Sequence, residues 1–177
     1  IERALDENTL VAFEMNGKPL PHLNGFPARL VVAGWTGTYW MKQLTDINVR
    51  SEPLGDFWMK SAYRVPAGRF PAADKFVTQE TAANVPITDI VVSSLVTSFQ
   101  DGARYRKGQD VDIAGIAWDG GRGIRDVQVS TDAGQSWKPA QLGHDYGRFS
   151  FRKFSYHFRP TKDGVYLIMV RAFNNRG

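Results

Sequence analysis

The chain has 177 residues, of which 42% are hydrophobic and 12% aromatic, enough for packed cores and too many for a disordered protein. Its 22 Lys and Arg against 18 Asp and Glu give a net charge of only +4, scattered along the chain, which argues against a partner nucleic acid. The absence of cysteine excludes disulfides and thiolate ligands within these residues, and no apolar run approaches the roughly 18 residues of a membrane span.

The N-terminal part predicts short strands joined by turns. Residues 10–15 (LVAFEM) are typical of a strand, and Asn16-Gly17 of a turn directly after it. Residues 30–32 form a short apolar strand. Apolar residues at positions 40, 41, 44 and 47 favour a short helix or turn over residues 39–47, which leads into a strand at 47–49.

The composition changes after this part. The stretch from Pro66 to Pro86 has three prolines and few periodic apolar positions, which predicts a linker over residues 67–86. Short alternating strands then recur at regular intervals over residues 87–177, as expected for an Ig-like β-sandwich that continues beyond Gly177. The strand-like runs are ITDIVVSSLVTSF, VDIAGIAW, IRDVQVSTD, FSYHF and YLIMVRAF, with turns at Asp101-Gly102, Lys107-Gly108, Gly120-Gly121, Ala133-Gly134 and Asp163-Gly164.

The stretch NGFPARLVVAGWTGTYWMK, residues 24–42, is the first candidate for a binding site. Gly34 and Gly37 follow an apolar strand and permit close approach of a ligand to the backbone, where N–H groups can bind an anion. Arg29 and Lys42 flank the loop and are suited to a phosphate. The alternative is a glycine-rich turn with two solvated cations, because the spacing is neither a Walker loop nor GxGxxG.

Three further motifs each have two interpretations. Tyr63, in FWMKSAYR, is either an active-site phenol or a core tyrosine whose hydroxyl reaches water. Residues 118–137 read as a hairpin with Trp137 as a core anchor, and an interface role is the alternative. Residues 148–159 alternate aromatic and cationic side chains, which favours a half-buried strand over a surface that stacks on nucleobases.

Three blocks of this sequence, taken in order, resemble the sulfite oxidase and sulfite dehydrogenase family of molybdopterin-dependent oxidoreductases. The blocks are FEMNGKPLPHLNGFPARLVVAGWTGTYWMKQLTDI, FWMKSAY and GIAWDGGRGIRDVQVSTDAGQSW. The resemblance implies a mainly β chain with some α structure. Residues 1–66 would be the C-terminal part of the molybdenum-cofactor domain, residues 67–86 the linker, and residues 87–177 an Ig-like β-sandwich used for dimerisation.

The resemblance also implies roles for individual residues. Arg29 and Lys42 match basic residues that hold the phosphate of a molybdenum–pyranopterin (molybdopterin) cofactor. Gly37 and Thr38 match positions where the loop backbone approaches that cofactor. Asn24 stands where many members have a histidine that contacts the pterin, and its Leu-Asn-Gly setting is similar to the bacterial sulfite dehydrogenase branch.

Tyr63 matches the active-site tyrosine of the family, which positions the oxyanion substrate and stabilises charge during oxygen transfer. The family ligates molybdenum through a cysteine that this chain lacks, so we expect no metal ligand here and no activity from these residues alone. The implied substrate is sulfite or another oxyanion or sulfoxide, and the implied acceptor is a cytochrome c. A homodimer, or a heterodimer with a haem subunit, in the periplasm is also implied. The rival interpretation is a noncatalytic β-sandwich interaction module.

Overall fold

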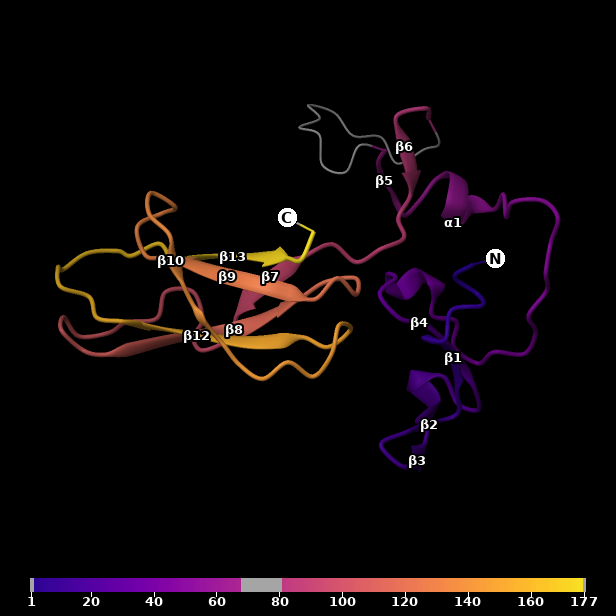
Figure 1. The fold of residues 1–177 in the computed structure, drawn as a ribbon, viewed down its shortest axis with the longest axis horizontal. Helices are drawn as coiled ribbons and strands as arrows, with labels where there is room; N and C mark the ends of the chain where they lie inside the picture. The colour runs from indigo at the N-terminus through magenta and orange to yellow at the C-terminus, as the bar shows by residue number, and fades with distance from the viewer. Residues whose placement is uncertain (1, 68–80, 177) are drawn as a thin grey trace. The chain divides into compact units, whose positions relative to one another are not determined.

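The computed structural model describes residues 2–67 and 81–176, which are mainly β (Figure 1). The chain divides into two compact units, Ile1–Asp89 and Ile90–Gly177. Helical structure among the described residues is limited to α1 (Phe57–Lys60) and the 3₁₀ turns η1 (His22–Asn24) and η2 (Gly37–Tyr39). The predicted fold class, mainly β with some α, is confirmed.

The first unit begins with two small antiparallel pairs. Strand β1 (Thr9–Ala12) pairs with β4 (Arg29–Val32), so that Val11 lies opposite Leu30. Strand β2 (Glu14–Met15) pairs with β3 (Lys18–Pro19) around a turn in which Asn16 and Gly17 both have positive φ. The strand predicted over residues 10–15 and its Asn-Gly turn are therefore confirmed, with an interruption at Phe13.

The helix or turn expected over residues 39–47, and the strand at 47–49, are wrong apart from the 3₁₀ turn η2 at the start. The chain beyond Tyr39 has no regular structure up to residue 50. It runs back along β4, where the Leu30 amide donates to the Met41 carbonyl and the Leu44 amide donates to the Ala28 carbonyl. The apolar residues at 40–47 therefore belong to an extended segment that runs antiparallel to β4, and they do not form one face of a helix.

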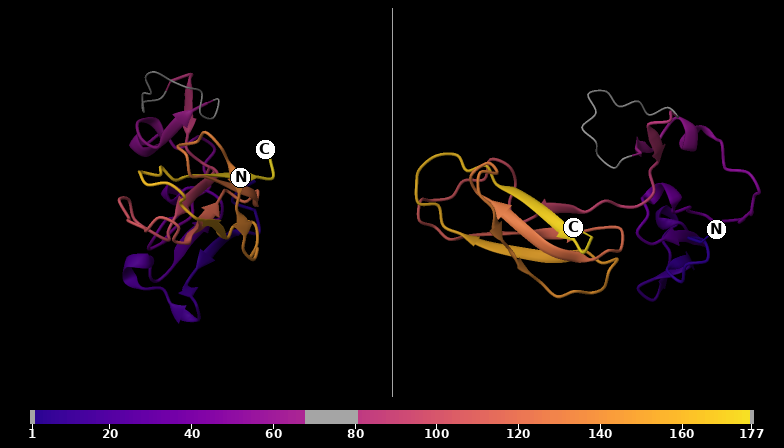
Figure 2. Two further views of the ribbon diagram at one scale, coloured as in Figure 1. Left: turned by 90° about the vertical axis from the view of Figure 1, so that its left-hand side faces the viewer. Right: turned by 45° about the horizontal axis from the view of Figure 1, so that its top comes forward.

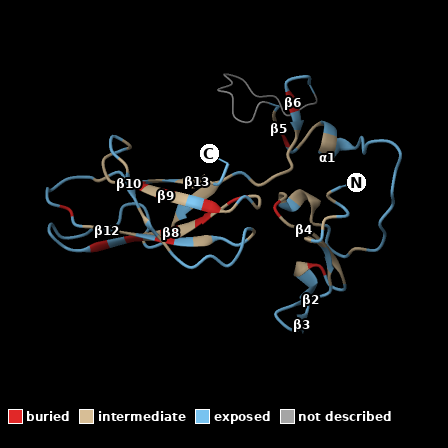
Figure 3. Ribbon diagram, in the orientation of Figure 1, coloured by how far each residue is buried: buried red, intermediate tan, exposed pale blue. Residues whose placement is uncertain are grey.

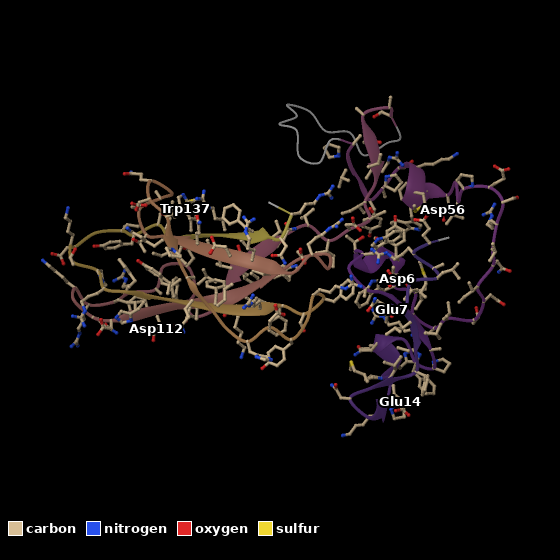
Figure 4. The ribbon with its side chains drawn as sticks, in the orientation of Figure 1. Asp6, Glu7, Glu14, Asp56, Asp112 and Trp137 are labelled. Atoms are coloured by element: carbon tan, nitrogen blue, oxygen red, sulfur yellow. The ribbon has the colours of Figure 1, made fainter. Side chains whose placement is uncertain are left out.

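The unit ends with a strand pair that the sequence did not predict. Helix α1 is capped by Asp56, whose carboxylate accepts from the Met59 amide at 3.3 Å (Figure 4). Strand β5 (Arg64–Pro66) then pairs with β6 (Asn84–Pro86). Strand β6 lies within the predicted linker, and the first compact unit extends to Asp89. The predicted domain bounds, 1–66, 67–86 and 87–177, stay a prediction. The rest of the predicted linker, residues 68–80, lies outside the described residues.

The second unit is a two-layer sandwich, as Figures 1 and 2 show. One sheet has the order β11-β12-β8-β7 and the other the order β10-β9-β13. All neighbouring strands are antiparallel. The strand bounds are β7 Ser93–Val96, β8 Val111–Trp118, β9 Ile124–Ser130, β10 Lys138–Pro139, β11 Gln141–Leu142, β12 Arg152–Phe158 and β13 Met169–Asn174.

Buried residues of both sheets, which Figure 3 colours red along the ribbon, form the core of the sandwich. Strand β8 shows the pattern most clearly, because every second residue from Val111 to Ala117 is buried. Full burial of a valine or isoleucine side chain such as Ile113 contributes about 1.5–3 kcal/mol. The buried hydrophobic residues of this core are Val111, Ile113, Ala117, Ile124, Val127, Val129 and Phe154.

The turns of the sandwich lie where the Gly-containing dipeptides predicted them, and each of the five turns has a glycine with positive φ. Strand β12 confirms the strand interpretation of residues 148–159 for Arg152–Phe158, where Phe154 is buried and its neighbours alternate, whereas residues 148–151 precede the strand. Trp137 was wrongly predicted as a core anchor. It is half-buried outside the core, and the Arg171 guanidinium lies 4.1 Å from its ring centroid.

Candidate cofactor and active site

The predicted phosphate-binding cations converge on the turn η1. An Arg29 Nη donates to the Asn24 carbonyl at 3.2 Å, and Lys42 Nζ donates to the Leu23 carbonyl at 2.7 Å. Gly25 has φ +113, and a Cβ there would lie 3.1 Å from Arg29 Cβ and 3.3 Å from Lys42 Cα. Only glycine combines this backbone conformation with such close neighbours. The structure thus brings Asn24, Arg29 and Lys42 together in one cationic cluster.

Gly37 and Thr38 adjoin this cluster through Trp40. The Trp40 ring lies under the Arg29 guanidinium at 5.4 Å, and the Trp40 amide donates to the Gly37 carbonyl at 3.0 Å. Gly37 is exposed and has open space where a Cβ would stand, so its backbone is accessible to a ligand. The Thr38 hydroxyl lies 2.9 Å from that of Thr36, which fixes the entry to the turn.

One atom of the cluster has an unused hydrogen-bonding capacity. Arg29 Nε is buried and has no hydrogen-bond partner among the described residues. A buried donor left unsatisfied costs about 1–3 kcal/mol, which an anionic acceptor would recover. A guanidinium with a free donor beside a second cation fits a phosphate-bearing group such as a pterin cofactor.

Tyr63 lies at the junction between α1 and β5 and is an exposed residue. It is 52% exposed, and its ring stacks on the indole of Trp58 with centroids 5.6 Å apart and 29° between the planes. The backbone has φ +50, a conformation that is rare for residues with a Cβ. Tyr63 therefore does not lie in a core, and its role toward a substrate stays a prediction.

Arg64 follows Tyr63 and is a buried charge that the sequence did not reveal. Its Nε donates to Asn84 Oδ1 at 2.6 Å, one Nη donates to the Asn84 carbonyl at 3.0 Å, and the other donates to the Met59 carbonyl. The guanidinium thereby joins the end of α1 to β6. No periodic pattern marks this arginine, because its partner Asn84 lies 20 residues away in the segment predicted as a linker.

Residues 87–89 connect Tyr63 to the loop that carries Gly37 and Thr38. The Ile87 amide donates to the Tyr63 carbonyl at 2.7 Å, and the next residue, Thr88, accepts from the Thr36 amide at 2.8 Å. Asp89 forms an isolated β-bridge with Trp35. The predicted tyrosine and the predicted loop are therefore attached to neighbouring points of one short segment.

The far side of this loop is held by aromatic and charged side chains. Trp35 packs edge to face on Tyr39 at 4.7 Å, and Arg3 lies 5.5 Å from the Trp35 ring centroid. Arg3 also forms an ion pair with Asp89 at 3.8 Å. Burial raises the pKa of Tyr39, so its phenol stays protonated at neutral pH. These contacts fix the loop without using the cations of the cluster.

Two family descriptions match the two units. Residues 1–58 match the "oxidoreductase molybdopterin binding domain", and residues 84–159 match the "Mo-co oxidoreductase dimerisation domain". Mitochondrial sulfite oxidase of Mus musculus is 38% identical over 145 residues, which cover 80% of this chain and 26% of that protein. The chain belongs to the sulfite oxidase family. Sulfite oxidase of Arabidopsis thaliana is 34% identical over 81% of this chain and 35% of its own length.

A solved structure of a family relative covers the chain almost completely. The sulfane dehydrogenase SoxCD from Paracoccus pantotrophus matches 99% of this chain and 42% of its own chain, with a TM-score of 0.80 and 27% identity. The chain spans about a quarter to a third of the length of the two sulfite oxidases compared above. The family domain and the cation cluster together indicate the molybdenum–pterin cofactor.

The described residues show no set of three metal-ligating side chains of the His, Cys, Asp or Glu type that could hold a metal ion. The chain contains no cysteine, so the thiolate that ligates molybdenum in the family is not among these residues. Nor does any helix of the described ranges have the length and apolar character to cross a membrane. The candidate site therefore comprises the cation cluster, the loop beside it and Tyr63, whose roles toward a cofactor or substrate stay predictions.

Proposed function

We propose that these residues are part of a molybdenum-dependent enzyme that oxidises sulfite to sulfate and passes the electrons to a cytochrome c. The observation that carries this proposal is the connection, through residues 87–89, between an exposed tyrosine and the loop beside a cation cluster. Tyr63, Arg29 and Lys42 all belong to one compact unit, which supports the proposal that the phenol would serve an oxyanion and the cations a pterin phosphate. The sulfite oxidases among the relatives support sulfite as the substrate.

The cofactor, when bound, supplies the two-electron oxygen-transfer chemistry. Arg29 and Lys42 would hold its phosphate, and the open backbone at Gly37 and Thr38 would lie against it. Asn24 shares the turn that both cations contact and would face the pterin. The Tyr63 hydroxyl would donate a hydrogen bond to the oxyanion and stabilise the charge that develops on its oxygens. The molybdenum thiolate would come from residues outside this sequence.

The second unit supports a proposal about assembly, namely that it forms a homodimer through the outer face of β9 and β13. Arg171 lies on this face, stacked over Trp137 and near Phe173, and it donates to Gln128 Oε1 at 2.7 and 3.0 Å. Aromatic residues and arginine dominate interface energetics. The face also carries Asp126, so a two-fold axis would allow Arg171 of one copy to meet Asp126 of the other. A haem subunit in place of the second copy is the alternative partner.

Export to the periplasm belongs to the same proposal and follows from the family resemblance. Fractionation of cells that express the full-length protein from its native gene tests it.

A second candidate function is favoured by a specific observation. The structural match that covers 99% of this chain is a sulfane dehydrogenase, not a sulfite oxidase. The same site would then act on another sulfur substrate, with the cation cluster and Tyr63 in unchanged roles. A noncatalytic module remains the rival from another class, and it predicts that the full-length protein contains no molybdenum.

The deciding experiment uses the full-length protein. We expect stoichiometric molybdenum and reduction of cytochrome c that depends on sulfite. Tyr63→Phe is expected to lower kcat/KM for sulfite at unchanged molybdenum content, whereas Tyr146→Phe, an exposed tyrosine of the second unit, serves as the control. Molybdenum without sulfite oxidation favours the second candidate, and turnover of a sulfane substrate would establish it. A protein without molybdenum refutes both.

A further inference from the structure

The backbone of Tyr63 has a conformation that needs external support. Its φ of +50 places a residue with a Cβ in the left-handed region, where such residues are uncommon. An unfavourable conformation of this kind persists only when surrounding contacts determine it, and it often occurs at functional sites. The question is which contacts hold the exposed phenol of Tyr63 in place.

The next residue provides the strongest attachment. Arg64 is only 8% exposed, and Asn84, which receives two of its hydrogen bonds, is 5% exposed. The third acceptor is the Met59 carbonyl at the end of α1. A planar guanidinium satisfies three acceptors in fixed directions, which a lysine ammonium on a flexible stem does not reproduce. The backbone just after Tyr63 is therefore fixed to both α1 and β6.

The other constraints act on the carbonyl and on the ring. The Tyr63 carbonyl accepts from the Ile87 amide at 2.7 Å, three residues beyond Asn84. The ring lies against Trp58, which itself contacts Phe57 edge to face at 5.2 Å. The tyrosine is thus held at its following residue, its carbonyl and its ring, although the residue as a whole is exposed.

We propose that Arg64 and Asn84 are positioning residues for Tyr63, and that their hydrogen bonds set where the phenol hydroxyl meets the oxyanion substrate. This inference rests on the proposed function for its kinetic consequence. Its structural content, that the Arg64–Asn84 pair fixes the Tyr63 side chain, does not depend on that function. A displacement of about 1 Å can cost 100-fold in rate, so the loss of the pair has a measurable effect.

The kinetic test is a double-mutant cycle in the full-length, molybdenum-loaded protein. Arg64→Lys and Asn84→Ala are each expected to lower kcat/KM for sulfite by about 10- to 100-fold. In a Tyr63→Phe background, either substitution is expected to have less than about a twofold further effect, because the hydroxyl that they position is gone. Arg50→Lys, an exposed arginine of the same unit, is the matched control and is expected to change nothing.

A second readout needs neither activity nor cofactor. The rate at which tetranitromethane nitrates Tyr63, followed by peptide mass spectrometry, is expected to rise in Arg64→Lys and Asn84→Ala, because the ring is released from Trp58. Nitration of Tyr146, which is 73% exposed in the second unit, is the internal reference and should stay constant.

The outcomes separate this inference from the proposed function. Equal fold losses in the wild-type and Tyr63→Phe backgrounds, or unchanged nitration of Tyr63, overturn the positioning role. Loss of molybdenum in parallel with activity in both variants also overturns it, because the pair would then maintain the fold of the unit. Absence of sulfite oxidation in the unmodified protein refutes only the proposed function. The nitration experiment then still tests whether Arg64 and Asn84 position Tyr63.

Discussion

Replacement of Arg29 by lysine tests whether the cation cluster holds the cofactor through a guanidinium or through charge alone. Arg29→Lys keeps the net charge of the chain but removes Nε, the buried donor that has no partner among the described residues. A hydrogen bond to a charged group contributes about 1.5–3 kcal/mol. Loss of one such bond to the pterin phosphate should weaken cofactor binding by about 10- to 150-fold.

The assay measures the pterin retained by the full-length protein after extended dialysis, from the fluorescence of the oxidised pterin released by acid. Lys18→Ala is the control, because Lys18 is an exposed cation of β3 in the same unit. Full pterin retention in Arg29→Lys would refute the argument from the unsatisfied Nε. An equal loss in Lys18→Ala would show that pterin retention responds to substitutions elsewhere in the unit and is not specific to this cluster.

Three further predictions concern the sandwich, each measured on the full-length protein. Gly115→Ala should lower the free energy of unfolding by about 3 kcal/mol or more, since a Cβ would lie 2.0 Å from the Leu95 carbonyl oxygen; a stability like that of the unmodified protein would contradict this packing. Hydrogen bonds from Ser136 and Ser130 hold the pKa of Asp132 at about 2, so its stabilising contribution is complete above about pH 4 and is lost as the pH falls towards 2. Asp132→Asn should remove that part of the acid dependence, and an unaltered dependence would exclude it. Arg171→Ala should convert the proposed dimer into a monomer, as measured by light scattering, whereas Leu95→Ser, on the other sheet, should leave the dimer intact. If both variants are monomers, or if both remain dimers, the outer face of β9 and β13 is not the dimer interface.

The sequence predicted most of the sandwich because strand periodicity there is local. Strand β8 occupies the alternating run at residues 111–118, and the Gly-containing turns separate the strands as expected. Trp137 was wrongly assigned to the core because alternation in a strand shows which residues share a face of the sheet, but not which of the two faces packs against the other sheet. Its indole lies on the outer side with Arg171, a contact between residues far apart in the chain.

In the first unit the sequence indicated candidate site residues but not the contacts that join them. Arg29 and Lys42 could be selected from a motif, and the structure shows that both contact η1. The return of residues 40–44 along β4 resembled a helix because backbone pairing leaves no signal in apolar spacing. The role of Asn84 could not be predicted either, because its partner Arg64 lies 20 residues away in the sequence and the segment between them was predicted as a linker.

Residues 87–89 have a practical consequence for exchanging parts between relatives. Consider a chimaera in which the sandwich of one relative replaces that of another, with the junction at the composition change near residue 86. This chimaera would lose the native Ile87 amide, which donates to the Tyr63 carbonyl, and the native Thr88 carbonyl, which accepts from the Thr36 amide. The donor's own residues would have to reproduce both bonds. A junction after Asp89 leaves the recipient's tyrosine and loop with their native partners. Two chimaeras that differ only in the origin of residues 87–89 should therefore differ in turnover.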